Sequence, residues 1–292
     1  MKVIFCCLIL ASLFLEACYC RAQEVDALGG RDDAGISFER SAGFLIVVEG
    51  RIENLNKLRF VLDTGATRSV VDRKIADRLR VPRRQSQRQV FSFDKIVTLE
   101  QAEFQDVQFG PVRLANLSML VDDLARFSDF GRDVDVIIGM DLLRLSNFAI
   151  DYDSRRVLFS PPDHAGFGPV PESNPLFFTV KIFIQDHPVN LVVDSGIEGV
   201  LLYENRLLEN VPNLRIEGGT KPTRLGSRLR AKWATLPSLR IGTINGETRV
   251  LLMNSPPAHI LRGIDGYIGT ASLGARRIEF NFTTKTLTLR RK

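Results

Sequence analysis

Two short segments of the chain each end an apolar run with an aspartate, a hydroxyl residue and a glycine. Residues 60–65 read FVLDTG and residues 191–196 read LVVDSG. One Asp-Thr-Gly alone is weak support for a site, because these are ordinary turn residues. Two copies can bring the carboxyl groups of Asp63 and Asp194 face to face, where one acts as a base and the other as an acid. Such a pair can activate water for amide hydrolysis without a metal or a covalent intermediate.

A second pair of motifs keeps the same spacing. VIIG ends at Gly139, 76 residues after Asp63, and GYIG ends at Gly269, 75 residues after Asp194. Two unrelated turns would not keep this register, so we interpret the halves as an internal duplication. A repeat of more than about 100 residues indicates duplicated domains, since solenoids and propellers repeat every 20 to 50 residues.

With these motifs the chain resembles the aspartic peptidases, and the retropepsin-like branch more closely than the pepsin branch. The resemblance covers nearly all of residues 36–292. It implies a mainly β fold of two pseudo-symmetric retropepsin-like (pepsin-type) acid-protease β-barrel lobes, with short helices and an active-site cleft between the lobes. Because both copies lie in one chain, dimerisation is unnecessary for the chemistry, and we expect a monomer.

The resemblance also assigns roles to the motif residues. Asp63 and Asp194 would be the catalytic pair that holds the attacking water, and the sequence does not say which of them is protonated. The supporting residues of the active-site loops would be Thr64, Gly65, Ser195 and Gly196, and the braces beneath the loops would be Ile138, Gly139, Ile268 and Gly269. Thr64 and Ser195 would hydrogen-bond to the opposite loop; the alternative is that each only satisfies its own turn.

The substrate would be a peptide or protein in extended conformation, lying beneath a hairpin flap. In the first lobe the flap falls near Phe91, Ser92 and Phe93, and in the second near residues 224–233. No tyrosine lies in residues 80–105, where a pepsin-like enzyme carries its flap tyrosine, and this favours the retropepsin-like assignment. The alternating phenylalanines fit a strand with one apolar face, so core packing is an equal alternative to substrate contact.

Ala66 and Ile197 follow the two glycines, where pepsin-like enzymes more often carry a serine or threonine. Such a hydroxyl can donate a hydrogen bond to the catalytic carboxylate, and its loss raises the pKa of the pair. We therefore expect a working pH milder than strongly acidic.

The sequence lacks the residue patterns that other hydrolytic mechanisms need. The sequence holds three histidines without ligand spacing, no HExxH and no G-x-S-x-G, so we expect no metal and no cofactor. The formal charge of +5 is slight and spread along the chain, which gives little reason to infer nucleic-acid binding. A second functional class stays open, a catalytically weak or inactive retropepsin-like fold that serves as a peptide-binding or assembly module. Glu198 favours it, because a third negative charge there could distort the cleft; the alternative is that this side chain points to solvent.

The pattern predicts short helices after both active-site loops, over residues 70–79 and 201–208, and a closing strand pair at the end of each half, within residues 149–159 and 278–289. A stretch rich in proline and glycine separates the halves. The predicted organisation is a signal peptide (1–22), a flexible tether (23–35), an N-terminal lobe (36–160), a linker (161–175) and a C-terminal lobe (176–292).

The N-terminus reads as a secretory leader. Lys2 precedes an apolar run over residues 3–15, which is too short to span a bilayer, and a candidate cut follows Ala22. All four cysteines lie within this leader, so the mature chain would have no disulfide. We expect export, to the periplasm or outside the cell, and no integral membrane span. Acylation at Cys18 is the lesser alternative, because Glu16 departs from the small uncharged residue expected there.

Overall fold

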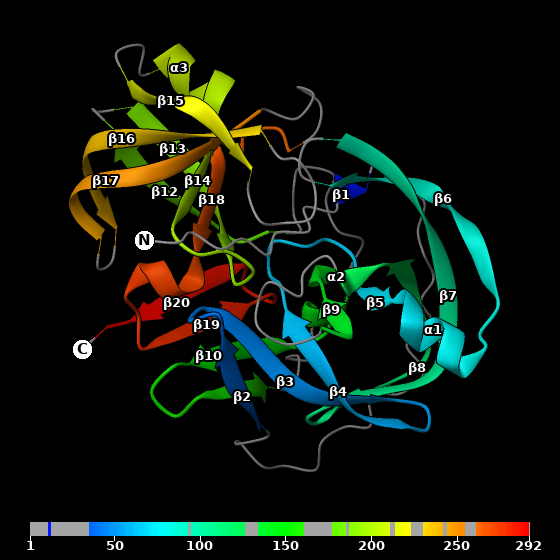
Figure 1. Ribbon diagram of the computed structural model, residues 1–292. Coiled ribbons are helices and arrows are strands. Elements are labelled where there is room, and N and C mark those ends of the chain that lie inside the picture. Colours follow the sequence, from blue (N-terminus) through cyan, green and yellow to red (C-terminus); the bar gives the residue numbers. More distant parts are fainter. Residues whose placement is uncertain are drawn as a thin grey trace.

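The computed structural model describes residues 11–12, 35–92, 95–125, 134–160, 177–184, 187–210, 214–222, 230–241, 244–254 and 261–291. Most of them lie in strands that form two sheets, and Figure 1 shows these sheets wrapped into two lobes. This mainly β architecture confirms the predicted fold class.

The first sheet takes its strands from both ends of the chain. In chain order they are β1 (Ala11–Ser12), β2 (Gly35–Ser41), β3 (Leu45–Ile52), β4 (Leu55–Leu62), β5 (Val70–Asp72), β6 (Arg83–Ser92), β7 (Lys95–Phe109), β8 (Val112–Asp122), β9 (Val136–Ile138), β10 (Asn147–Asp151), β11 (Arg156–Ser160), β19 (Arg277–Asn281) and β20 (Thr286–Arg290). β1 lies in the predicted leader and pairs with β6.

The second sheet comes from the second half alone. Its strands are β12 (Thr179–Ile184), β13 (His187–Asp194), β14 (Val200–Tyr203), β15 (Arg215–Pro222), β16 (Arg230–Ile241), β17 (Ile244–Met253) and β18 (Gly266–Gly269). The described helices are α1 (Arg73–Leu79), α2 (Met140–Leu143), α3 (Glu204–Asn210) and the 3-10 helix η2 (Thr270–Leu273).

The two predicted helices begin later than expected. Residues 70–72 and 200–203 form the strands β5 and β14, each paired on both sides, and the helices α1 and α3 follow them. The prediction was wrong here because sheet pairing overrides a local helical spacing. α1 starts where the Asp72 side chain caps it, accepting a hydrogen bond from the backbone N–H of Lys74.

The closing strands of the two halves meet in one sheet. β10 pairs with β19 in antiparallel register, with Phe148 opposite Phe280 and Ile150 opposite Ile278. The rings of Phe148 and Phe280 stack with centroids 4.6 Å apart, and Phe178 packs edge-on against Phe280 at 5.4 Å. In Figure 1 these strands lie below the strands of the second sheet and beside β2 and β3 of the first sheet, so the C-terminal segment joins the halves through a shared apolar layer.

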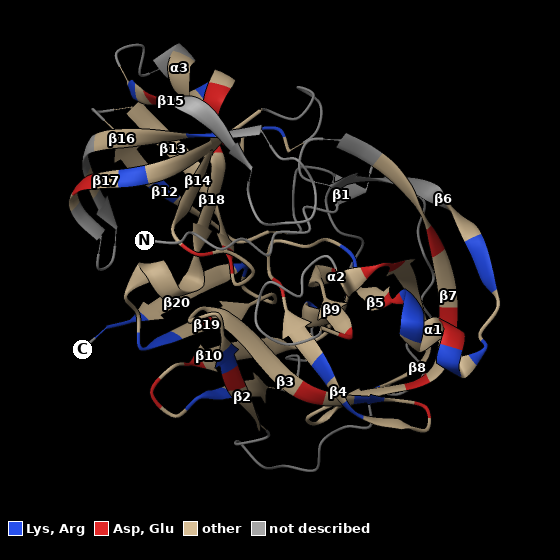
Figure 2. Ribbon diagram, viewed as in Figure 1, with Lys and Arg blue, Asp and Glu red and all other residues tan. Residues whose placement is uncertain are grey.

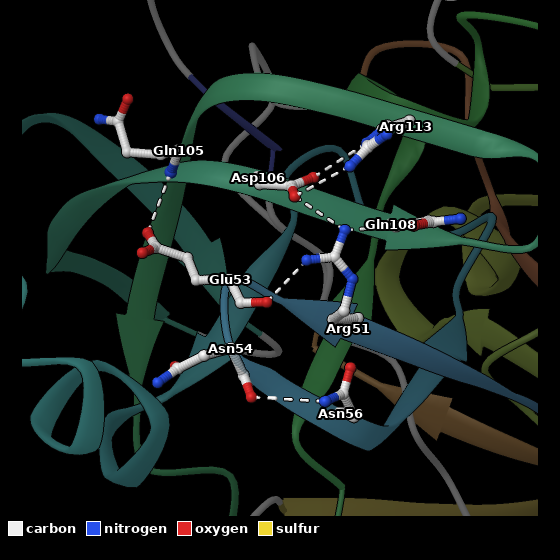
Figure 3. A network of polar contacts seen from close by, with 8 residues as sticks. All are labelled: Arg51, Glu53, Asn54, Asn56, Gln105, Asp106, Gln108 and Arg113. Carbon is white, nitrogen blue, oxygen red and sulfur yellow. Dashed lines mark hydrogen bonds and ion pairs between the residues drawn. The ribbon is translucent and has the colours of Figure 1, made fainter.

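Figure 3 shows a polar network that fixes the β3–β4 hairpin to β7 and β8. Arg51 donates to the carboxylate of Asp106 at 2.7 Å and to the carbonyl oxygen of Glu53 at 2.7 Å. Arg113 donates two further bonds to Asp106, both at 3.4 Å. The hairpin that leads into β4 is therefore held at its outer end by one carboxylate and two guanidinium groups.

We expect Asp106→Asn to lower the free energy of unfolding by about 0.5 to 1 kcal/mol, since this ion pair is partly exposed. Hydrogen bonds from Arg113 and Arg51 lower the pKa of Asp106 below its ordinary value. A lowered folded-state pKa stabilises the fold above the unfolded pKa, and this stabilisation is lost as the pH falls through the folded pKa. Urea unfolding at pH 7 and near pH 2.5 measures it, and an equal difference between variant and wild type at both values would contradict the assignment.

Charges of both signs are interspersed over α1 and the outer strands (Figure 2). Arg83 forms ion pairs with Asp77 of α1 and Glu100 of β7, and Arg73 pairs with the same Glu100. These pairs fix the helix that follows the first active-site loop to the neighbouring strands. In the part of the chain that the structure describes, no helix has the length and apolar character needed to cross a membrane.

Candidate active site

The first aspartate, Asp63, follows β4, a strand that pairs with β3 on one side and with β9 on the other. β9 lies between β4 and β5, parallel to β4 and antiparallel to β5, so the loop from residue 63 to residue 69 passes over the end of β9. The backbone N–H of Asp63 donates to the carbonyl oxygen of Ile138 at 2.9 Å. The end of β4 is thereby fixed in the interior, which explains why Asp63 is completely buried.

The second half repeats this arrangement. β18 lies between β13 and β14, again parallel to the strand that carries the aspartate and antiparallel to the strand that follows the loop. Asp194 stands opposite Gly269 in this register, and Asp194 is also completely buried. Each half thus presents one aspartate at the same point of the same local topology.

The glycines of both VIIG-type motifs lie directly against the active-site loops. A Cβ at Gly139 would lie 2.7 Å from the carbonyl carbon of Arg68, and one at Gly269 would lie 2.4 Å from the carbonyl oxygen of Ile197. Met140 N–H donates to the carbonyl oxygen of Ala66 at 2.7 Å. No side chain fits at these two glycines, because the backbone of the loop occupies that space.

Four hydrogen bonds connect the two loops across the lobes. The hydroxyl of Thr64 donates to the carbonyl oxygen of Val193 at 2.8 Å and accepts from the N–H of Ser195 at 2.9 Å. The hydroxyl of Ser195 donates to the carbonyl oxygen of Leu62 at 2.7 Å and accepts from the N–H of Thr64 at 3.0 Å. Both hydroxyls are buried and satisfied by the opposite loop, so the pair holds the lobes in a single register.

Backbone amides hold the two carboxyl groups. Oδ1 of Asp63 accepts from the N–H groups of Gly65 at 2.9 Å and Ala66 at 3.0 Å, and Oδ1 of Asp194 accepts from Gly196 at 2.6 Å. A Cβ at Gly65 would lie 2.1 Å from Oδ2 of Asp194, so the backbone of one loop touches the carboxyl of the other. The side chain of Asp194 also contacts that of Asp63.

Burial raises the pKa of Asp63 well above its ordinary value. The charge of Asp194 and a hydrogen bond to the Asp194 side chain raise this pKa further. The bonds from Gly65 and Ala66 oppose this shift without cancelling it. When the carboxyls of Asp63 and Asp194 are both ionised, the buried Oδ2 of Asp63 accepts no hydrogen bond from the described residues. One proton shared by the pair removes the repulsion and supplies the donor, so the geometry suits two carboxyls that share one proton.

The sequence reasoning missed two sets of polar residues near the site. Asp135 and Asp265 stand four residues before the two brace glycines and accept equivalent hydrogen bonds, from Arg59 N–H at 2.9 Å and Asn190 N–H at 2.8 Å. This match was visible as a third shared element of the repeat. The contact of Asp141 with Ser69 has no counterpart in the second half and left no such signal.

The predicted flap residues lie outside the described side chains. Phe91 and Ser92 belong to β6, of which only the backbone is described at these positions, and Phe93 lies outside the described residues. Most of the second flap, residues 224–229, also lies outside them, as does the predicted linker. Their contact with a substrate stays a prediction.

A family described as aspartyl protease matches residues 48–142, a stretch that contains Asp63 and its brace. Among solved structures, the chain is similar to a retropepsin-like aspartic protease from Rickettsia conorii. The two share 16% sequence identity over 43% of this chain and 89% of that chain, with a TM-score of 0.30. No curated protein matches the chain.

Proposed function

We propose that this chain is a retropepsin-like aspartic endopeptidase in which Asp63 and Asp194 together activate one water molecule. The observation that carries the proposal is the buried pair itself. Two carboxyls from different lobes meet on loops that are hydrogen-bonded to each other, and the pKa of Asp63 is raised by burial and by the charge of Asp194. Two like charges held together at an energetic cost, with a strongly shifted pKa, are typical of catalytic sites.

In the proposed mechanism Asp194 begins as the carboxylate and Asp63 as the acid. Asp194 takes a proton from water while the water oxygen attacks the carbonyl carbon of the peptide, and Asp63 gives its proton to the carbonyl oxygen. The resulting tetrahedral diol then breaks its C–N bond: the proton on Asp194 passes to the leaving nitrogen, and Asp63 regains a proton from a diol hydroxyl. The pair returns to its starting state with one proton, and no metal or covalent intermediate is needed.

The substrate of this mechanism is a peptide or protein in extended conformation. A single chain supplies both aspartates, so the proposed active form is a monomer. The apolar leader indicates that the enzyme acts after export, and residues 23–292 would be the mature form. Mass spectrometry of the N-terminus of the exported protein would identify the cleavage site and would show any acyl group on Cys18.

The alternative function is a catalytically weak or inactive module that binds peptides. Glu198 favours it, because this half-buried carboxylate follows the second active-site loop, where the first loop carries Thr67. The hydrogen bonds of Thr64 and Ser195 favour the enzyme, because they hold the two active-site loops together and so keep the two carboxyls close. A binding module has no need of two facing carboxyls.

Peptide cleavage separates these two functions. Purified residues 23–292 are incubated with a mixed peptide library from pH 3 to pH 8, with and without a statine-type inhibitor of aspartic peptidases. The proposal predicts cleavage that the inhibitor abolishes. A folded protein that binds the library peptides without cutting them at any pH would support the binding module instead.

The raised pKa of Asp63 also predicts the pH dependence of that cleavage. The active form carries one proton on the pair, and this form persists to a higher pH when burial and the Asp194 charge hold the proton on Asp63. Ala66 adds only its backbone N–H to the carboxylate, so no side-chain hydroxyl there lowers the pKa. We expect kcat/KM to be largest above about pH 4, the ordinary aspartate value. A maximum near pH 2 to 3 would contradict this account.

A further inference from the structure

Asp141 contacts the first active-site loop although it belongs to neither Asp-Thr-Gly motif nor brace motif. It lies at the start of α2, two residues after Gly139. Its Oδ2 accepts from the N–H of Ser69 at 3.0 Å and its Oδ1 accepts from the hydroxyl of Ser69 at 2.7 Å. The same hydroxyl accepts from the N–H of Gly139 at 2.9 Å, so the fully buried Ser69 is bonded on three sides.

These bonds lie two contacts away from the catalytic carboxyl. Next to Asp141, Met140 N–H donates to the carbonyl oxygen of Ala66, and Ala66 N–H donates to Oδ1 of Asp63. Ser69 ends the loop that begins with Asp63. The carboxylate of Asp141 therefore closes the loop at its far end, while the backbone beside it supports the amide that holds Asp63.

The second lobe provides an internal comparison. The sheet register pairs Val70 with Ile137 in the first lobe and Leu201 with Tyr267 in the second, which makes Val200 the counterpart of Ser69. Two residues after Gly269 stands an alanine, where the first lobe has Asp141. Neither counterpart can make these hydrogen bonds.

The second loop is held by neutral groups instead. The N–H of Gly199 donates to the hydroxyl of Ser272 at 3.0 Å, and Gly269 N–H donates to the carbonyl oxygen of Gly199 at 2.8 Å. The hydroxyl of Tyr152, from the first half, donates to that of Thr270 at 2.8 Å. Among the described contacts, a carboxylate holds the loop of Asp63, whereas hydroxyls and backbone groups hold the loop of Asp194.

We propose that Asp141, acting through Ser69, is a positioning residue that keeps the Asp63 loop in its catalytic geometry. This inference rests on the proposed function of Asp63 and adds a residue that the motifs do not contain. The ionised form is the one that accepts both bonds from Ser69, because a protonated carboxyl must use one oxygen as a donor.

The surroundings of Asp141 connect this role to pH. Burial raises the pKa of Asp141, while the charges of Arg68 and Arg144 and the bonds from Ser69 lower it by less. Arg68 lies closest, with Nε 3.5 Å from Oδ2 of Asp141. Asp141 therefore takes up a proton at a higher pH than an exposed aspartate does. On protonation Asp141 no longer accepts both bonds from Ser69, so the first loop loses an acceptor, while the second loop does not.

Three variants test the proposal: Asp141→Asn, Ser69→Ala and, as a matched control, Asp153→Asn. The control removes the same charge from an exposed carboxylate that pairs with Arg276. We expect the first two variants to lower kcat by about 10- to 100-fold, the cost of a small misplacement of a reacting group, with KM changed less than twofold. Their effects should not add in the double variant, because both remove the same contact. The control should keep wild-type kcat.

A second readout does not depend on activity. The carboxyl ¹³C shift of Asp63, followed across pH, should give a different pKa in Asp141→Asn and the wild-type value in Asp153→Asn. If the Asp63 titration is the same in all three proteins, or if kcat falls only as far as the folded fraction falls in thermal unfolding, the positioning role is refuted. A wild type that cleaves no peptide would refute the proposed peptidase, and the Asp63 titration would still decide the role of Asp141.

Discussion

Asp63→Asn and Asp194→Asn should each lower peptide cleavage by about 10²- to 10⁴-fold, the usual contribution of general acid–base catalysis. An amide of the same shape can neither take a proton from water nor return one to the substrate. Because the two carboxyls act as one unit, the double variant should be scarcely worse than either single variant. Initial rates on one cleaved peptide, with identical enzyme concentrations, give all three values.

These variants should remain folded, which separates lost chemistry from lost structure. The pKa of Asp63 is raised in the folded state, so its protonated form stabilises the fold below the unfolded pKa, and this stabilisation is lost as the pH rises through the folded value. At pH 7 the neutral asparagine of Asp63→Asn should therefore give a thermal midpoint at or above that of the wild type. Cleavage that survives in either single variant at the wild-type rate would show that the pair is not the catalytic centre.

Gly65→Ala should disable the site by a steric route. The new Cβ would lie 2.1 Å from Oδ2 and 2.4 Å from the carboxyl carbon of Asp194, distances that real Cβ atoms do not reach. Either Asp194 or the first loop must move, and both are fixed by buried hydrogen bonds. We expect a loss of about 100-fold or more in kcat/KM and a loss of about 1 to 3 kcal/mol in the free energy of unfolding.

Gly43→Ala is the matched control for this variant. Gly43 has a φ of 87° and lies in the turn between β2 and β3, with nothing within 4 Å of the position of a Cβ. An alanine there costs stability through backbone strain, but it touches no residue of the site. Activity measured on the folded fraction should therefore stay at the wild-type level in Gly43→Ala. The same result for Gly65→Ala would mean that the two loops do not meet as described.

The sequence predicts the local topology of the site well, because that topology is repeated. An apolar strand, a turn with Asp and Gly, and a later apolar strand ending in Gly occur twice at nearly equal spacing, so each half supports the interpretation of the other. The helices were placed too early, since residues 70–72 and 201–203 begin the segments with helical spacing but lie in strands that pair with β9 and β18. A local sequence pattern does not show whether a segment will pair with the strands of a sheet.

The sheet shared by the halves could not be predicted from periodicity. Residues 277–290 alternate like a strand pair, yet their partner, β10, lies more than 120 residues earlier in the chain. Alternation identifies a strand and its buried face but not its neighbour. Pairing of Phe148 with Phe280 depends on how the whole chain folds back, and only the structure shows it.

Single polar contacts were equally hidden. Ser69 and Asp141 are common residue types 72 positions apart, and the second half carries Val200 and Ala271 in their places. A comparison of halves selects what they share, so it passes over a feature that only one lobe has. Asp135 and Asp265 are the opposite case, since both halves carry them and a longer comparison would have found them.

The central claim is that Asp63 and Asp194 form one acid–base pair across the lobes, and the titration of Asp63 tests it most directly. The carboxyl ¹³C shift of Asp63 would be followed from pH 2 to pH 9 in the wild type and in Asp194→Asn. The account predicts a wild-type pKa well above the ordinary aspartate value, and a lower pKa once the Asp194 charge is removed. An Asp63 pKa that is the same in both proteins would contradict it, because the two carboxyls would then titrate independently.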